Sequence, residues 1–205
     1  MAVTAPEAEA RYVLSFSVGG LLVKECVGVA AIYLAQPDKE RNWSATRKLA
    51  QAENVVQART QSSGARVTSE AVKRLACLDD AELELLLNGT SSERAQLAWV
   101  AACRKYAFVG EFATQVLREH FLTLKPKLDY DDYDSFFRSK ALWHPELNDL
   151  TDATYKKLRS ELFRMMKHAE LLSDKGDILP VVLSPAVTEL LRKSDREFFP
   201  WHGAA

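Results

Sequence analysis

Helix start and stop signals follow one another from residue 18 to residue 125, without any run of alternating apolar and polar residues. Asp79 with Glu82 and Thr90 with Glu93 form two capping boxes, in which a side-chain oxygen binds the main-chain N–H three residues later and the glutamate reaches back. Asn88-Gly89 between them is typical of a helix end, because glycine tolerates the left-handed conformation found there. Alternation would indicate strands, so the chain up to residue 125 is predicted to be helical.

The predicted helices are bounded by caps and by prolines, which cannot continue a helix. The predicted spans are Gly20 to Gln36, Asn42 or Ser44 to Val56, Ser62 or Ser63 to Leu78, Asp79 to Asn88, Thr90 to Tyr106, and residue 107 to Leu122. In the second helix the expected buried stripe is Ala45, Leu49, Ala52 and Val56, and in the third it is Val67, Ala71, Leu75 and Leu78.

Beyond Pro126 two further helices and a short final one are predicted. Asp131–Asp134 begins a helix that His144-Pro145 ends, and Thr151 caps a longer helix. Ser184-Pro185 starts the last helix, since proline suits the first helical position. The expected buried stripe of the longer helix is Tyr155, Leu158, Leu162, Met165 and Ala169.

A β-hairpin is predicted where two apolar runs, Leu171-Leu172 and Ile178–Leu183, flank a polar turn that contains glycine. A first helix at 107–122, a recognition helix at 152–168 and this hairpin follow one another in the order of a winged helix-turn-helix. The linker Ala141–Thr151 is longer than in a tight helix-turn-helix. The predicted fold class is therefore mainly α, with a helical N-terminal domain at 1–105 and a winged-helix-like C-terminal domain at 106–205 that carries one small hairpin.

The formal charge of this chain of 205 residues is −1, which argues against a protein that coats nucleic acid indiscriminately. Cys26, Cys77 and Cys103 are too few and too widely spaced for a disulfide framework and fit a reducing cytosol. The most apolar stretch, Val18–Ala35, is interrupted by Lys24 and Glu25 and is predicted to be a buried helix, not a membrane span. Because no signal peptide is recognisable, we expect a cytoplasmic protein without membrane insertion.

One basic face is expected on the third helix. Arg66 and Lys73 lie seven residues apart and therefore within about 20° of each other around the helix axis, with Arg74 and Arg59 within reach of the same surface. These four cations could neutralise backbone phosphates. In the alternative interpretation, Glu70 forms ion pairs with its neighbours and the face is merely solvated.

A second basic face is expected on the 152–168 helix, where one carboxylate, Glu161, lies among five cations. Lys175 would add a cation at the tip of the predicted wing. The candidate DNA contacts of this second face are Lys156, Lys157, Arg159, Arg164, Lys167 and Lys175.

Catalytic and cofactor motifs are missing from the sequence. The acidic run Asp129–Asp134 lacks the glycine and distal glutamate of a calcium loop, and the four histidines share no ligand spacing. GxSxG, P-loop, GxGxxG and HExxH patterns do not occur. We therefore expect a protein that is not an enzyme and has no metal, cofactor or small-molecule substrate. The aromatic tail Phe198–Trp201 is expected to pack onto its own domain.

Three segments carry a resemblance to a known family. They are Tyr12–Leu22 (Tyr-Val-Leu-Ser-Phe-Ser-Val-Gly-Gly-Leu-Leu), Asn54–Arg66 (Asn-Val-Val-Gln-Ala-Arg-Thr-Gln-Ser-Ser-Gly-Ala-Arg) and Leu78–Leu86, which is followed by the helix around Trp99. They resemble the BrxA family, small accessory proteins of BREX bacteriophage-exclusion systems, and Asn54–Arg66 is the most specific part.

The resemblance implies a fold similar to that of the antitermination factor NusB and DNA binding without catalysis. It reaches Arg59 and Arg66 through the motif, whereas the 156–167 helix depends on its charge pattern alone. The expected partners are double-stranded DNA and other BREX proteins. Two alternatives remain: an assembly module that docks other defence proteins, and an RNA-binding NusB-like protein.

Overall fold

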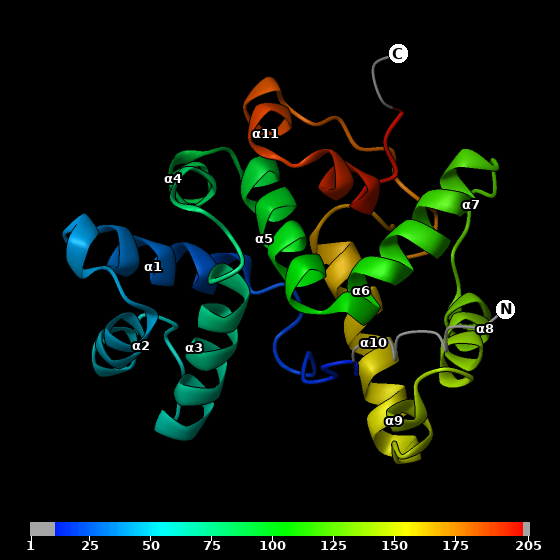
Figure 1. The fold of residues 1–205 in the computed structure, drawn as a ribbon, viewed down its shortest axis with the longest axis horizontal. Helices are drawn as coiled ribbons and strands as arrows, with labels where there is room; N and C mark the ends of the chain where they lie inside the picture. The colour runs from blue at the N-terminus through cyan, green and yellow to red at the C-terminus, as the bar shows by residue number, and fades with distance from the viewer. Residues whose placement is uncertain (1–10, 203–205) are drawn as a thin grey trace, which may run out of the picture.

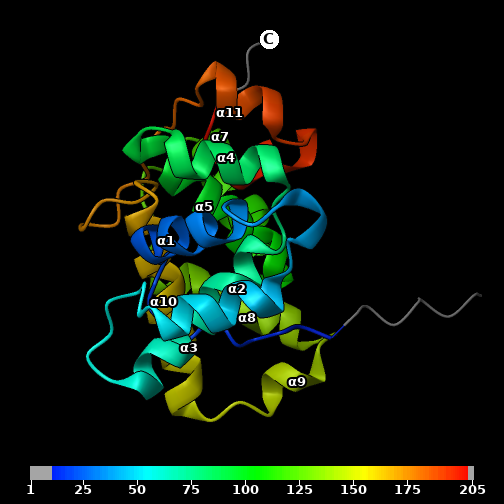
Figure 2. The ribbon, with the colours of Figure 1, turned by 90° about the vertical axis from the view of Figure 1, so that its left-hand side faces the viewer.

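A computed structural model describes residues 11–202 of the chain. This part is built mainly from helices, which pack around a central helix (Figure 1, Figure 2). The α-helices are α1 (Val23–Leu34), α2 (Trp43–Ala52), α3 (Gln61–Leu75), α4 (Asp80–Asn88), α5 (Ser91–Lys105), α6 (Ala107–Phe112), α7 (Glu119–Leu122), α8 (Tyr130–Ala141), α9 (Pro145–Asn148), α10 (Asp152–His168) and α11 (Pro185–Leu190). The 3-10 helices η1 (Asp38–Glu40) and η3 (Lys193–Phe198) and the π-helical turn η2 (Ala113–Arg118) complete the order.

Helix α5 lies at the centre of the molecule (Figure 1) and is buried on every side. All side chains from Ala95 to Cys103 are buried, as expected for a helix that is surrounded by others. It packs against α1, α3, α4, α6 and α10, and its alanines allow these neighbours to approach closely. The indole N–H of Trp99 donates to the Phe198 carbonyl oxygen at 2.9 Å.

Both predicted capping boxes are confirmed. The Glu82 N–H donates to Asp79 Oδ1 at 2.9 Å while the Asp79 N–H donates to Glu82 Oε2 at 2.9 Å, and Thr90 and Glu93 exchange the same two bonds. Glu93 also accepts a hydrogen bond from the hydroxyl of Ser184 at 2.6 Å. This bond, together with those from Thr90, holds the pKa of Glu93 below its usual value. The start of α5 is thereby tied to the start of α11.

The remaining helix starts are nearly all where the sequence places them. Asn42, Thr151 and Ser184 accept the predicted capping hydrogen bonds. The cap of α3 is Thr60, whose hydroxyl accepts from the Ser63 N–H at 3.2 Å, and not Ser62 or Ser63. The cap lies earlier because the preceding loop already turns the chain at residue 60.

The predicted buried stripe of α2 is wrong. The helix ends at Ala52, so that Val56 lies beyond it, and Leu49 is 44% exposed. The buried positions are Thr46 and Ala50, one residue further along. Such a shift turns the buried face by about 100°. The stripe of α10 is confirmed in its buried members Leu158, Leu162, Met165 and Ala169, with Tyr155 half-buried.

The predicted β-hairpin is wrong as well. Leu172 and Ile178 form one isolated antiparallel bridge, Lys127 and Asp177 form another, and residues 11–202 contain no sheet. A tight turn does form, in which the Ser173 N–H donates to the Asp177 carbonyl oxygen at 2.8 Å. Beyond it the Leu179 N–H donates across the turn to the Leu171 carbonyl oxygen at 3.0 Å, but the pairing does not continue, because the Val181 N–H donates to the Pro200 carbonyl oxygen at 3.1 Å.

The linker predicted between α8 and α10 contains the short helix α9, with Pro145 in its first turn. In addition, α6, η2 and α7 form one continuous run over the predicted helix 107–122. The buried residues of both halves of the chain form a single cluster. A boundary at residue 105 stays a prediction.

Arg104, near that boundary, joins α5 to α4 and η3. Its guanidinium donates to Glu82 Oε1 at 2.6 Å and to Asp195 Oδ2 at 2.7 Å, and both carboxylates are buried. The aromatic tail docks close by, as predicted: Phe199 is fully buried, and Arg118 donates to the carbonyl oxygens of Phe199 and Trp201 at 3.3 Å.

Replacing Arg104 with methionine should lower the free energy of unfolding by about 3–5 kcal/mol, because two buried carboxylates lose their shared cation. Urea unfolding monitored by circular dichroism measures this. Arg47→Met, at an exposed position of α2, is the control and should change stability by less than about 0.5 kcal/mol. Equal stability of the two variants would show that the Arg104 ion pairs do not hold the fold.

Candidate nucleic-acid interface

Arg74 is not a surface residue, so its assignment as a DNA contact is corrected. Its side chain is fully buried, and its Nε donates to Glu70 Oε1 at 2.8 Å. Its Nη1 donates to the carbonyl oxygens of Gly20 at 2.7 Å and Leu21 at 3.3 Å. Glu70 Oε1 also accepts from the Tyr106 hydroxyl at 2.6 Å. The guanidinium therefore serves the core and lies out of reach of a phosphate.

The other cations of this face have no carboxylate partner, because Glu70, the carboxylate of α3, pairs with the buried Arg74. Since Glu70 faces the core, it does not neutralise Arg66 or Lys73, which are exposed and have no ion-pair partner among residues 11–202. Arg59, in the loop before α3, is also exposed and unpaired within the described chain. In the solvated-face alternative Glu70 pairs with Arg66 and with Lys73 or Arg74. The pair with Arg74 is confirmed, but it is buried, and Glu70 forms no pair with Arg66 or Lys73.

On α10 most of the cations are paired. Lys156 Nζ lies 2.9 Å from Asp152 Oδ2, Arg164 Nη2 lies 2.7 Å from Glu161 Oε1, and Lys167 Nζ lies 3.3 Å from Asp174 Oδ1. In each of these three pairs at least one partner is exposed to solvent, so the pairs are weak. Lys157 and Lys175 are exposed and have no ion-pair partner in the part of the chain that the structure describes.

Arg159 is held more firmly than its neighbours. Its Nη1 lies 2.8 Å from Asp134 Oδ1, and its guanidinium stacks over the Tyr130 ring at 4.2 Å. Tyr155 donates to the same carboxylate. Partial burial would raise the pKa of Asp134, but the hydrogen bonds from Tyr155 and Arg159 outweigh it and lower this pKa. Burial and the neighbouring Asp134 raise the pKa of Tyr155 to about 12. Asp134 comes from α8, so no pattern within α10 could reveal this pair.

The two basic helices meet at the Gly19-Gly20 turn. The Gly20 carbonyl oxygen accepts from Arg74 of α3, while the Gly20 N–H donates to Glu161 Oε2 of α10 at 3.1 Å. Glycine is required there, because φ is +64° and a Cβ would lie 2.9 Å from His168 Cε1. The segment between them is visible as the dark blue chain beside α3 and α10 (Figure 1). Two helices far apart in sequence are thereby joined through one residue, Gly20.

Two further exposed cations lie beside α3 and were missed in the sequence. Arg47 and Lys48 belong to α2, which packs against α3, and neither has an ion-pair partner among the described residues. The signal was present: α2 contains these two cations and no carboxylate.

Other candidate chemistry finds no site in the structure. Within residues 11–202, no group of three or more His, Cys, Asp or Glu side chains is placed to hold a metal ion. The acidic run instead caps α8, where Asp129 accepts from the N–H groups of Asp131 and Asp132. None of the described helices is long and apolar enough to cross a membrane. Cys26 and Cys103 are buried, and burial raises the pKa of the Cys26 thiol to about 12.

Comparison with known proteins identifies the family. The BrxA family model matches residues 10–195. The chain belongs to the BrxA family. A relative from Escherichia coli O9:H4 (strain HS) named "BREX protein BrxA" is 25% identical over 177 residues, which cover 85% of this chain and 81% of the relative.

A second protein of the same name, from Paramagnetospirillum magneticum (strain ATCC 700264 / AMB-1), is 23% identical over 193 residues, covering 93% of this chain and 95% of the relative. An uncharacterized protein from Magnetospirillum magneticum has a similar fold in its crystal structure, with a TM-score of 0.75 and 21% identity. The similarity covers 92% of this chain and 96% of that one. The family recognised in the sequence is thus confirmed over most of the chain.

Arg74→Met and Lys73→Met form a matched pair of neighbouring substitutions on α3. Arg74→Met should lower the free energy of unfolding by about 3–5 kcal/mol, because Glu70 would remain as an uncompensated buried carboxylate. Lys73→Met should leave stability within about 0.5 kcal/mol of the parent. Chemical denaturation of both variants distinguishes a core arginine from a surface lysine, and similar losses for the two would contradict this assignment.

Proposed function

We propose that this protein is a non-enzymatic DNA-binding component of a BREX bacteriophage defence system in the cytoplasm. The observation that carries the proposal is a set of exposed cations without carboxylate partners on a nearly neutral chain. Its members are Arg59, Arg66 and Lys73 near α3, Lys157 and Lys175 on or after α10, and Arg47 and Lys48 on α2. The names of the two relatives support the place in a BREX system, and neither is the name of an enzyme.

Backbone phosphates are the contacts that such lysine and arginine side chains make with duplex DNA. The exposed pairs Lys156–Asp152 and Arg164–Glu161 contribute less, because a phosphate must displace a carboxylate. Lys167 and Arg159 face the same competition from Asp174 and Asp134. Affinity should therefore depend steeply on salt and weakly on sequence.

A NusB-like N-terminal part at 1–105 and a winged-helix-like part at 106–205 remain the proposed arrangement for this function. In this arrangement α10 corresponds to the recognition helix. The wing is replaced by the turn that carries Lys175, since no hairpin forms there among residues 11–202. Lys157 and Lys175 would then contact phosphates on either side of the helix.

Charge reversal tests the two surfaces separately. Arg66→Glu with Lys73→Glu, and Lys157→Glu with Lys175→Glu, should each weaken duplex binding at least about tenfold at low salt. Each should also reduce the slope of log K against log salt concentration by about two, since each lost phosphate contact removes about 0.9 from the slope. Fluorescence anisotropy with a labelled duplex, repeated over a salt series, measures both quantities.

The control for this experiment is Arg192→Glu with Lys193→Glu, which changes the net charge equally. Both residues are exposed and lie at the start of η3, at the end of the molecule that carries α11, away from α3 (Figure 1). This variant should bind DNA nearly as well as the parent. If the control loses as much affinity as the two test variants, only the overall charge matters and both surfaces are wrongly assigned.

A second candidate function is docking of other defence proteins. The aromatic tail and the acidic run do not support it, because the tail packs onto its own chain and the acidic run caps α8. The observation that favours it is an exposed apolar pair between α8 and α9, in which Leu142 is 79% and Trp143 is 73% exposed. RNA binding is the third candidate, and competition between duplex DNA and structured RNA for the same protein distinguishes it from DNA binding.

Replacing Leu142 and Trp143 with serine tests the docking candidate. Because both side chains are largely exposed, the fold should persist, whereas binding to a purified BREX protein in nuclease-treated solution should fall. Size-exclusion chromatography of mixtures of the purified components measures this. Complexes that survive the double substitution but are lost after Arg66→Glu with Lys73→Glu would place the contact on the basic face instead.

A further inference from the structure

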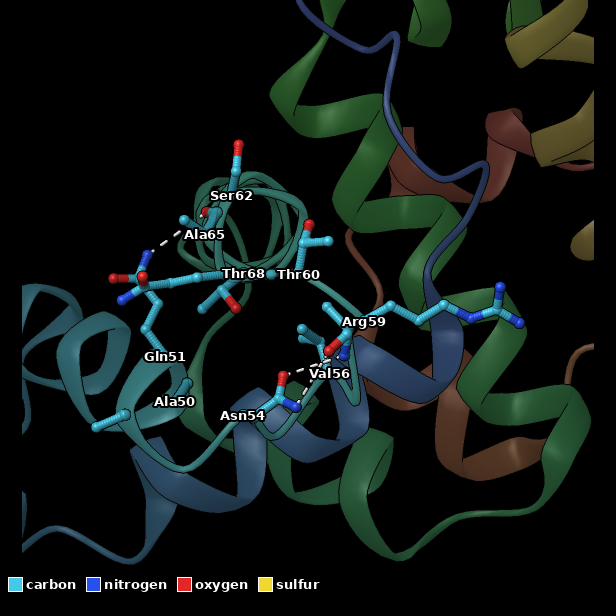
Figure 3. Close-up of a pocket in the computed structure, with 13 residues that line it drawn as sticks. Ala50, Gln51, Asn54, Val56, Arg59, Thr60, Ser62, Ala65 and Thr68 are labelled. Carbon is cyan, nitrogen blue, oxygen red and sulfur yellow. Dashed lines mark hydrogen bonds between the residues drawn. The ribbon is translucent and has the colours of Figure 1, made fainter.

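A cleft of about 700 Å³ opens between the end of α2, the loop 53–60 and the first turns of α3. Figure 3 shows Gln51 on one side of it, Asn54 and Val56 on another and the start of α3 above them. Its volume lies within the range of small-molecule sites, about 300–1,000 Å³. The cleft coincides with Asn54–Arg66, the most specific part of the family resemblance.

The wall of the cleft is held in place by two features. Asn54 has a φ of +47°, and its side chain accepts from the Ala58 N–H at 3.0 Å and donates to the Ala58 carbonyl oxygen at 3.3 Å. Gly64 on α3 lets this loop approach closely, because a Cβ there would lie 3.2 Å from the Ala58 Cβ. The loop is thus fixed against the helix without a ligand.

The lining of the cleft suits an anion. Thr60 caps the Ser63 N–H, whereas the N–H groups of Gln61 and Ser62 donate to no acceptor in the described chain. Free N–H groups and the helix dipole favour negative charge at the start of a helix of 15 residues. Arg59 is the charged residue in the lining, and no carboxylate is part of it. Its side chain extends away from Gln51 and Ala65 (Figure 3), so the main-chain groups supply the nearest positive charge.

Thr68 is an independent sign of a ligand. Its side chain is fully buried and lines the cleft, yet its hydroxyl has no hydrogen-bond partner. Figure 3 shows the hydroxyl directed toward the side of the cleft formed by Ala50 and Asn54. Buried hydroxyl groups are nearly always hydrogen-bonded, and leaving one unpaired is unfavourable. A polar atom of a bound molecule would remove this deficit.

We infer that the cleft binds a free mononucleotide. Its phosphate would bind the N–H groups of Gln61 and Ser62, and its base would lie against Ala50 and Val56 with a polar edge on the Thr68 hydroxyl. A backbone phosphate cannot make this last contact, because it stays with its duplex on the outside of the molecule and Thr68 is fully buried. The inference therefore does not depend on DNA binding.

Calorimetric titration with AMP tests the inference, with Thr68→Val as the main variant. Valine has nearly the shape of threonine and removes the unpaired hydroxyl, so the ligand-free variant should unfold at the same or a higher temperature. The parent should bind AMP saturably, and Thr68→Val should bind it about fivefold more weakly, the equivalent of one hydrogen bond. Thr68→Ser, which keeps the hydroxyl, should retain affinity within about twofold.

Ser62→Asp tests the phosphate end of the cleft without disturbing the core. A carboxylate in the first turn stabilises a helix and Ser62 is exposed, so folding should persist while AMP binding is lost. Adenosine, which lacks the phosphate, should bind the parent more weakly than AMP and should not distinguish parent from Ser62→Asp. Inorganic phosphate should bind the parent more weakly than AMP.

Several results would overturn the inference. AMP could fail to bind the parent at millimolar concentration, or could bind parent, Thr68→Val and Ser62→Asp equally. Inorganic phosphate as tight as AMP would show a site for a simple anion. A Thr68→Val variant that loses duplex binding but not AMP binding would assign the cleft to DNA. Arg66→Glu with Lys73→Glu should keep AMP affinity within about twofold while losing duplex affinity, which separates this inference from the proposed function.

Discussion

The buried guanidinium of Arg74 is the interaction on which the arrangement of the basic surfaces depends. It binds Glu70 and the carbonyl oxygens of the Gly20 turn, and the N–H of the same turn binds Glu161. A buried arginine is stable only if its donors are satisfied, so the N-terminal segment must pass between α3 and α10. Arg74 and the Gly20 turn together thereby set the relative position of the two helices.

The distribution of carboxylates decides which cations remain available. Arg74, Arg104 and Arg159 each bind acidic side chains. Arg104 and Arg159 bind carboxylates of other helices, whereas Arg74 binds Glu70 of its own helix and reaches the distant Gly20 turn through a carbonyl oxygen. These pairs hold the helices together, so their cations are not available to bind DNA. The cations that remain free include Arg47 and Lys48 on α2 and Arg66 and Lys73 on α3, where the carboxylate of α3, Glu70, faces inward. A nearly neutral chain can in this way present a local positive surface.

The sequence was informative where structure depends on neighbours in the chain. Both capping boxes, the caps of α2, α10 and α11 and the stripe of α10 are local patterns, and the structure confirms them. The burial of Arg74 could not be predicted, because spacing placed it near Lys73 and only the distant Gly20 turn explains it. The hairpin failed for a similar reason: pairing across the turn stops after Leu179, which still bonds to Leu171, and Val181 binds the distant residue 200 in place of a strand across the turn. The partners of Arg159 and Lys167 likewise come from outside their helix.

Helix α3 has a different polar role on each side. Arg66 and Lys73 face solvent, whereas Gly64 and Thr68 face the cleft beneath the loop 53–60. Contact with DNA would explain the cations of Asn54–Arg66 but not its asparagine, its glycine or the hydroxyl of Thr68 just beyond. Those residues shape and line a cleft that a duplex cannot fill. A ligand in the cleft would hold the loop that carries Arg59 against the start of α3. Binding in the cleft would in this way affect the cations on the outer side of the same helix.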